Sequence, residues 1–325
     1  MSNKSGKKAN MPKIVVIGGG TGLSVMLRGL KKYDLDLTAI VTVADDGGSS
    51  GILRTELNML PPGDIRNVII SLADTEPLLE MVLQHRFTQG EGLAGHNLGN
   101  LLIAAMQEIT GDFVSAIKEL SRVLAVKGSV LPASLQTVNL TAEFEDGTIV
   151  TGESNIPKVG KKIKRVFLEP TEIEALDEAV ESILQADAII IGPGSLYTSI
   201  IPNLLVSGIK EAVLTAKGKK IYIANVMTQP GETDDFTVID HIKAIEDHIG
   251  RTFIDIVVVN QEEVEPGIIK QYRDKGANPV KPDIEKLDQL GYQVIADRFL
   301  TYHTYLRHDP KKLSEKIISI IMGLV

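Results

Sequence analysis

The chain has 325 residues, 43% of them hydrophobic, and a formal net charge of −8, which predicts a folded protein with a sizeable core and argues against a broad nucleic-acid-binding surface. It contains no cysteine, which excludes disulfides, thiolate nucleophiles, iron–sulfur clusters and cysteine-ligated zinc. Residues 1–12 are polar and basic, so they predict a flexible tail and not a signal peptide. No segment reaches the roughly 18 uncharged apolar residues of a membrane-spanning helix. We therefore expect a cytoplasmic protein without membrane insertion, with residues 13–325 as a single domain.

A glycine turn lies near the start of the chain. Residues 13–22 read Lys-Ile-Val-Val-Ile-Gly-Gly-Gly-Thr-Gly, where the apolar run 14–17 is typical of a strand buried on both faces. The segment 24–32 follows with helical apolar spacing. Such a turn directs several backbone N–H groups at one point, which suits a phosphate. The residues expected to contact a phosphorylated ligand are Gly19, Gly20, Thr21 and Gly22; the alternative is a tight turn without a ligand.

Strands and helices alternate along the rest of the chain. Apolar patterns predict strands at 37–44, 138–144, 148–153, 163–168, 188–191, 221–226 and 256–259. They predict helices at 76–86, 97–109, 112–124, 235–248 and 317–324. Two more helices are predicted from capping residues: one begins at Asp64 and runs to Leu72, and one has a Thr171–Glu174 capping box and runs to Leu184.

This alternation predicts an α/β fold, Rossmann-like, with a mostly parallel sheet and helices on both faces. Asp146-Gly147 is a hairpin turn signal between two predicted strands. We therefore expect an inserted antiparallel hairpin lobe at about 135–168.

Polar loops follow several of the predicted strands, where open α/β sheets bind ligands. The first, 45–51, contains two adjacent carboxylates and could hold a hard cation or a ribose, or be a solvated turn. The loops 192–199 and 225–233 combine glycines with hydroxyl and amide side chains, which suit phosphate and a nucleobase edge. The expected ligand residues in these three loops are Asp45, Asp46, Ser49, Ser50, Gly192, Gly194, Ser195, Tyr197, Asn225, Thr228, Gln229, Gly231 and Glu232.

Two further polar segments lie between the predicted strands. Residues 61–67 (PPGDIRN) and 95–100 (GHNLGN) add Asp64, Arg66, Asn67, His96, Asn97 and Asn100 to the expected ligand residues. Together the loops predict a ligand cleft. His96 is the best acid–base candidate and Asp45 with Asp64 could hold Mg²⁺, although no histidine lies in a metal-binding spacing and no catalytic constellation is recognised.

These loops, taken in order, resemble the CofD-like family and, within it, the bacterial YvcK branch of gluconeogenesis factors. The segments that carry the resemblance are IGGGTGLS (17–24), TVADDGGSSG (42–51), PPGDIRN (61–67), GHNLGN (95–100), GPGSLYTS (192–199), NVMTQPGET (225–233) and YLRHD (305–309). The last of these adds Arg307, expected to neutralise a diphosphate because its planar fork donates two hydrogen bonds. A salt bridge from Arg307 to Asp309, or to a partner at a helix end, is the alternative.

The resemblance implies a Rossmann-like regulator of gluconeogenic growth, cell shape and cell-wall synthesis that binds UDP-sugars, notably UDP-N-acetylglucosamine. It implies no required cofactor, with Mg²⁺ as an optional ion, and a homo-oligomer with cell-wall synthesis or regulatory proteins as partners. One rival is a CofD-type, Mg²⁺-dependent transferase of phospholactate or nucleotidyl groups. The other is an NAD-dependent oxidoreductase, which Leu23 disfavours because it stands at the third glycine position of the dinucleotide fingerprint.

Overall fold

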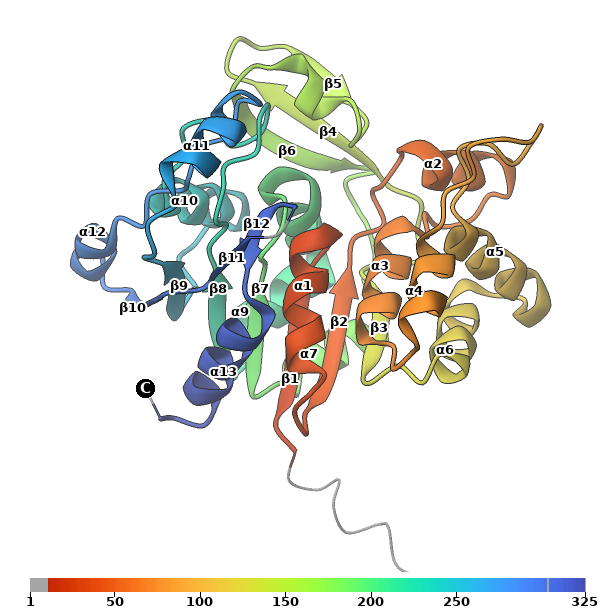
Figure 1. The fold of residues 1–325 in the computed structure, drawn as a ribbon, viewed down its shortest axis with the longest axis horizontal. Coiled ribbons are helices and arrows are strands. Elements are labelled where there is room, and N and C mark those ends of the chain that lie inside the picture. The colour runs from red at the N-terminus through yellow and green to blue at the C-terminus, as the bar shows by residue number, and fades with distance from the viewer. Residues whose placement is uncertain (1–10, 303, 325) are drawn as a thin grey trace, which may run out of the picture.

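The computed structural model describes residues 11–302 and 304–324, so the predicted flexible tail at 1–12 lies almost wholly outside the described residues. Seven parallel strands form the main sheet in the order β10-β9-β8-β7-β1-β2-β3 (Figure 1). Their bounds are β1 (Lys13–Gly18), β2 (Asp36–Val41), β3 (Ser129–Pro132), β7 (Ala188–Ile191), β8 (Lys219–Ile223), β9 (Ile256–Asn260) and β10 (Gln293–Asp297). The predicted parallel α/β sheet is confirmed.

Helices cover both faces of this sheet, and their apolar sides pack on strands that are themselves buried on both faces. In Figure 1, α1 and α13 lie in front of the sheet, and α7 and α9 lie behind it. The helices are α1 (Gly20–Leu30), α2 (Gly48–Glu56), α3 (Gly63–Leu72), α4 (Pro77–Gln84), α5 (Leu98–Thr110), α6 (Phe113–Val123), α7 (Asp177–Leu184), α8 (Ile201–Leu205), α9 (Ser207–Thr215), α10 (Val238–Ile249), α11 (Pro266–Arg273), α12 (Ile284–Gln289) and α13 (Pro310–Ile321).

The strand order reverses at β1. The chain runs from β1 to β2 and β3 on one side of the sheet, then returns to place β7, β8, β9 and β10 on the other side. A crevice therefore opens beyond the carboxyl ends of β1 and β7, which is where ligands bind in sheets of this kind.

A smaller antiparallel sheet confirms the predicted hairpin lobe. Its strands β4 (Asn139–Phe144), β5 (Ile149–Thr151) and β6 (Ile163–Glu169) lie in the order β5-β4-β6, above the main sheet in Figure 1. Leu140 and Phe144 are fully buried and give the lobe an apolar face. A second small hairpin, β11 (Leu300–Tyr302) with β12 (Leu306–His308), was not predicted and packs against α1.

The prediction that Asp64 caps a helix is wrong. The helix begins at Gly63, Pro62 stands at its N-cap position, and Asp64 lies in its first turn. The Asp64 carboxylate instead accepts a hydrogen bond from the backbone N–H of Gly20, at the start of α1. The Asp64 side chain therefore bonds to another helix, α1, and does not cap its own helix as the local sequence had predicted.

The predicted capping box at Thr171 and Glu174 is also wrong, because α7 begins only at Asp177. The preceding segment is bound to the loop after β3: the Glu174 N–H donates to Gln136 Oε1 at 2.8 Å, and the Glu174 carbonyl accepts from Ser134 Oγ at 2.6 Å. These bonds use the backbone groups that a helix would need.

Other differences concern boundaries and omissions. Residues 48–51, part of the loop expected at 45–51, begin α2, which runs to Glu56. The last helix begins at Pro310, where Asp309 caps it, not at 317. Helix α10 begins at Val238, after a Thr237–Asp240 capping box, and β8 ends at Ile223. The elements β3, α8, α9, α11, α12, β10, β11 and β12 were not predicted.

Candidate functional site

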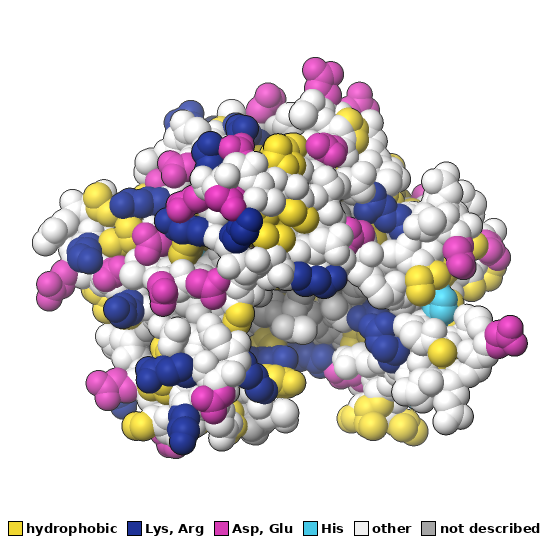
Figure 2. Space-filling model, turned by 90° about the horizontal axis from the view of Figure 1, so that it is seen from above, with side chains coloured by type: hydrophobic (Ala, Val, Ile, Leu, Met, Phe, Trp, Pro, Cys, Tyr) yellow, Lys and Arg dark blue, Asp and Glu magenta, His cyan; other side chains and the backbone are white. Residues whose placement is uncertain are grey.

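A cleft of about 670 Å³ opens at the point where the strand order reverses. Figure 2 shows the molecule hollowed near the centre of this face, with Lys and Arg side chains around the hollow. The predicted ligand residues that line the cleft are Gly20, Thr21, Gly22, Asp45, Asp64, Gly194, Ser195, Asn225, Thr228, Gln229, Glu232 and Arg307. The structure thus brings together residues from six separate segments of the chain.

The glycine turn forms one wall of this cleft. Gly19 is the N-cap of α1 and supplies no side-chain cap, while Gly20 has φ +68°, a left-handed conformation that favours glycine. Gly22 packs closely on the next loop, since a Cβ there would lie 3.1 Å from the carbonyl oxygen of Pro193. The first N–H groups of a helix have no partner within the helix, so this turn offers donors to an anion in the cleft.

Two pairs of hydrogen bonds hold the loops that face the glycine turn, 192–199 and 225–233, in place. The Gly194 N–H donates to Asn225 Oδ1 at 3.1 Å, and Asn225 Nδ2 donates to the Gly194 carbonyl at 2.7 Å. Thr228 is paired with Asn278 through both its N–H (2.8 Å) and its hydroxyl (2.9 Å). By contrast, Gln229 Oε1 is buried and has no hydrogen-bond partner among the described residues, so it can accept a bond from a ligand.

Four carboxyl groups face the cleft: Asp45, Asp64, Glu153 and Glu232. Glu232 is 7% exposed and accepts a 2.5 Å hydrogen bond from Ser195 Oγ. Burial, followed by the charge of Asp45, raises the pKa of Asp64 to about 6. The same two causes, with Asp64 and Glu232 added, raise the pKa of Glu153 to about 8. This part of the cleft therefore suits neutral donors, such as hydroxyl groups, better than anions.

The predicted Mg²⁺ ligands Asp45 and Asp64 both line the cleft and lie close enough to perturb each other electrostatically. Across residues 11–302 and 304–324, no group of three or more His, Asp or Glu side chains is arranged to hold a metal. Mg²⁺ often binds through one or two carboxylates plus ligand phosphates. The pair fits an ion of that kind, which a phosphorylated ligand would help to hold, and not a closed protein site.

Cationic and aromatic side chains form the remaining wall. Arg307, on β12, lies with its guanidinium carbon 5.4 Å from the ring centre of Tyr305, and Lys275 and Tyr272 line the cleft beside it. The Asp309 carboxylate accepts from the N–H groups of Lys311 and Lys312 at 2.9 and 3.0 Å. The alternative of a salt bridge from Arg307 to Asp309 does not occur, and Arg307 is left to face the cleft.

Seven predicted ligand residues lie behind the cleft wall and bond mainly to one another. Arg66 donates to Asn100 Oδ1 and Asn67 Oδ1, both at 2.7 Å, and Asn97 caps α5 through its side chain. The seven are Ser49, Ser50, Arg66, Asn67, His96, Asn97 and Asn100, and none of them lines the cleft. Their amide, hydroxyl and guanidinium groups support the Asp45 and Asp64 segments, so any ligand role they have is indirect in this conformation.

His96 belongs to this network, because its Nδ1 lies 3.2 Å from Ser49 Oγ. Five other predicted residues also stand outside the cleft lining: Gly19, Asp46, Gly192, Tyr197 and Gly231. Tyr197 is 3% exposed and packs edge-on against Phe236 and His248, while Asp46 accepts from the N–H of Ser154 at 2.9 Å. These contacts brace the loops that do line the cleft.

Sequence reasoning missed several residues that line the cleft. Thr198 and Ser199 lie inside a predicted loop, and Tyr305 and His308 flank Arg307, so their neighbours could have indicated them. Glu153 and Lys275 had no such signal: one is supplied by the hairpin lobe and the other follows α11, which was not predicted. Separately, no helix within the described residues combines the length and apolar composition that crossing a membrane requires.

Comparison with known proteins shows the family of the chain. The family model for "2-phospho-L-lactate transferase CofD" matches residues 14–300. The gluconeogenesis factor of Bacillus subtilis is 56% identical over 311 residues, which is 95% of this chain and 98% of that protein. The gluconeogenesis factor of Halalkalibacterium halodurans is 56% identical over 96% of each chain. A crystal structure of a Bacillus halodurans protein aligns with TM-score 0.91 and 55% identity, over 95% of this chain and 99% of that one. The chain belongs to the CofD family, among the relatives known as gluconeogenesis factors.

Proposed function

We propose that the protein is a cytoplasmic regulator that binds a nucleotide-sugar, UDP-N-acetylglucosamine, in this cleft. Its role would lie in gluconeogenic growth, cell shape and cell-wall synthesis. The observation that carries the proposal is that groups suited to a diphosphate and groups suited to a sugar line the same cleft. The N–H groups at the start of α1 that Asp64 does not bind, together with Arg307, suit a diphosphate, and a wall of hydroxyl and carboxyl groups suits a sugar.

The dimensions agree with such a ligand. A volume of about 670 Å³ lies within the usual range of sites for small molecules and cofactors. Ser195, Thr198 and Glu232 form a connected set of donors and acceptors, with Ser195 Oγ 2.5 Å from Thr198 Oγ1. Sugar hydroxyls can join such a set because each of them both donates and accepts.

Regulation is favoured over catalysis by the position of the acid–base candidate. His96 is 7% exposed and lies behind the wall, bonded to Ser49. A catalytic acid or base must come within hydrogen-bond reach of the reacting group. His96 cannot do so without a rearrangement of the 95–100 segment.

A transferase of the CofD kind is the second candidate, and Asp45 with Asp64 in the cleft favours it, together with the family description. With Mg²⁺ bound, these residues would hold an ion that polarises a phosphoryl oxygen. An NAD-dependent oxidoreductase is less well supported. Leu23 on α1 stands where the dinucleotide fingerprint has its third glycine, and its side chain is fully buried. It therefore prevents the close packing of helix on strand that this glycine allows.

A protein partner and a homo-oligomer form part of the proposal, and α4 offers a surface for such contacts. Leu78 and Met81 are 70% and 69% exposed on this helix, where only Leu83 is buried. Exposed apolar side chains gathered on one helix are typical of protein–protein contacts.

Titration calorimetry against UDP-N-acetylglucosamine, UDP-glucose, GDP and NAD, each with and without Mg²⁺, tests the function. We expect the UDP-sugars to bind and NAD not to bind. Binding of GDP that depends strictly on Mg²⁺, with no binding of UDP-sugars, would favour the transferase. Binding of NAD alone would overturn the proposal.

A further inference from the structure

Tyr305 is an exposed aromatic side chain at the rim of a mostly polar cleft. It is 54% exposed, it lines the cleft, and it lies on the turn between β11 and β12. The chain has no tryptophan and only 4% aromatic residues, so an aromatic ring left open at a ligand site needs a reason. Burial in the core, the usual reason for an aromatic residue, does not apply here.

The hairpin that carries Tyr305 is held in place from several sides. Beside it, the Leu306 N–H donates to the hydroxyl of Tyr272 at 2.7 Å. His308 is 7% exposed and bonds to the backbone of Ala224, which anchors the end of β12 at the carboxyl end of β8. These contacts hold β12, the strand that directly follows Tyr305, which lowers the entropy cost of presenting its ring to a ligand.

One side of the Tyr305 ring is already occupied. The guanidinium of Arg307 lies over the ring, 5.4 Å from its centre, which is within the range of a cation–π contact. A flat ring has a second face, and the high exposure of this side chain leaves area for it. A nucleobase is the part of a nucleotide-sugar that a tyrosine face binds best, because every base has a π-face.

The part of the cleft where four carboxyl groups gather is unsuited to a base. Asp45, Asp64, Glu153 and Glu232 gather there, and carboxylates beside hydroxyls favour the sugar. With the sugar beside these carboxyl groups and the diphosphate at α1 and Arg307, the ring of Tyr305, which packs against Arg307, is the surface left for the base.

We infer that Tyr305 is the stacking platform for the nucleobase, while Arg307 on its other face binds the diphosphate of the same ligand. The inference rests on the proposed function and adds a stacking surface for the base, whereas the sequence had indicated only amide side chains for its edge. Stacking alone is tolerant of base identity, so Tyr305 supplies affinity for the nucleotide half and not selectivity for uracil.

Calorimetry with two ligands tests this inference: UDP-N-acetylglucosamine and N-acetylglucosamine 1-phosphate, which lacks the uridine and one of the two phosphates. Tyr305→Ala should weaken binding of the first by about tenfold, in the range found for loss of one stacked base, and leave the second unchanged. Tyr305→Phe should bind both as the parent does. The matched control is Tyr302→Ala on the same hairpin, which is 40% exposed but does not line the cleft, and it should change neither.

A spectroscopic test uses the absence of tryptophan from the chain. Tyr305→Trp creates a single tryptophan whose fluorescence should be quenched by UDP and not by N-acetylglucosamine 1-phosphate, whereas Tyr302→Trp should respond to neither. If UDP-N-acetylglucosamine binds the parent and Tyr305→Ala equally well, or if saturating UDP leaves the fluorescence of the Tyr305→Trp variant unchanged, the inference is wrong while the proposed function stands. If the parent binds no UDP-sugar, the proposed function fails, and the inference fails with it.

Discussion

Replacement of Glu153 by glutamine is expected to stabilise the protein, and to do so more strongly as the pH rises. Burial is the largest cause that raises the pKa of this carboxyl from 4.5 to about 8, followed by the charges of Asp45, Asp64 and Glu232. A carboxyl with a raised pKa contributes stability that is fully present below its unfolded pKa, here 4.5. That stability is lost as the pH rises through the folded pKa of about 8. Glutamine does not ionise, so the Glu153→Gln variant does not lose this stability as the pH rises.

The size of the effect follows from the two pKa values. At about 1.4 kcal/mol per pH unit, the interval from 4.5 to about 8 sets an upper limit of about 5 kcal/mol. Water reaches part of the Glu153 side chain and screens its ionised form. We therefore expect the gain of Glu153→Gln over the parent to grow by about 2 kcal/mol between pH 5 and pH 8.5.

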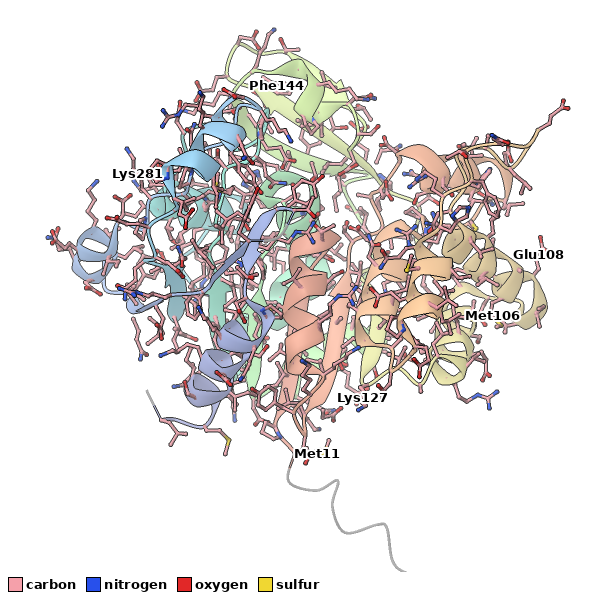
Figure 3. All side chains as sticks on the ribbon, viewed as in Figure 1. Met11, Met106, Glu108, Lys127, Phe144 and Lys281 are labelled. Atoms are coloured by element: carbon pink, nitrogen blue, oxygen red, sulfur yellow. The ribbon has the colours of Figure 1, made fainter. Side chains whose placement is uncertain are left out.

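Urea unfolding at pH 5 and pH 8.5, followed by circular dichroism, measures this difference. Glu108→Gln is the matched control, because Glu108 on α5 is exposed and extends from the right edge of the molecule in Figure 3. The control should change the free energy of unfolding equally at both pH values. If Glu153→Gln behaves like the control, or gains less at pH 8.5 than at pH 5, then Glu153 is not held in the acidic surroundings described here.

Three further changes test other parts of the molecule. Arg307→Ala should lose about 1–3 kcal/mol of UDP-N-acetylglucosamine binding by calorimetry, and Arg307→Lys should recover only part of it; unchanged affinity in both would remove Arg307 from the ligand site. Gly29→Ala should cost about 1–3 kcal/mol in urea unfolding, because its Cβ would collide with the carbonyl oxygen of Pro310 and with Ser314 Oγ, where α1 and α13 cross. Its control Gly267→Ala meets nothing within 4 Å on α11 and should gain about 0.4–1 kcal/mol, so an equal response of the two would contradict the crossing. Met81→Glu should shift the protein toward monomers in light scattering after size exclusion, and an unchanged mass would exclude this part of α4 from the interface.

Much of the fold could be predicted because its strands are long apolar runs. Residues 14–17 and 188–191 have no polar side chain, which only a strand covered on both faces tolerates, and both are central strands of the sheet. The edge strands could not be found in this way. Strand β3 has four residues and ends in proline, and β10 is only partly buried, so neither shows a distinctive pattern.

Helix α2 shows a different limit. Its sequence, GSSGILRTE, has low helix propensity, yet Ser49 and Ser50 are 2% and 3% exposed. Gly51 packs directly on the backbone of Asp46, and Ser49 bonds to the 95–100 segment. The helix forms because tertiary contacts hold it, and those contacts join segments that are far apart in the sequence.

The candidate site was predictable as a set of loops but not as a set of contacts. Asn225 and Gln229 stand four residues apart in one loop and carry the same amide group. Both ends of the Asn225 amide are used by the backbone of Gly194, whereas Gln229 Oε1 is buried without a partner among the described residues. The difference arises because the Gly194 loop lies against Asn225 and not against Gln229, and the sequence of the 225–233 loop alone does not predict this. Because a buried acceptor without a partner is unfavourable, we expect Gln229 to contact the ligand and Asn225 to support the loop.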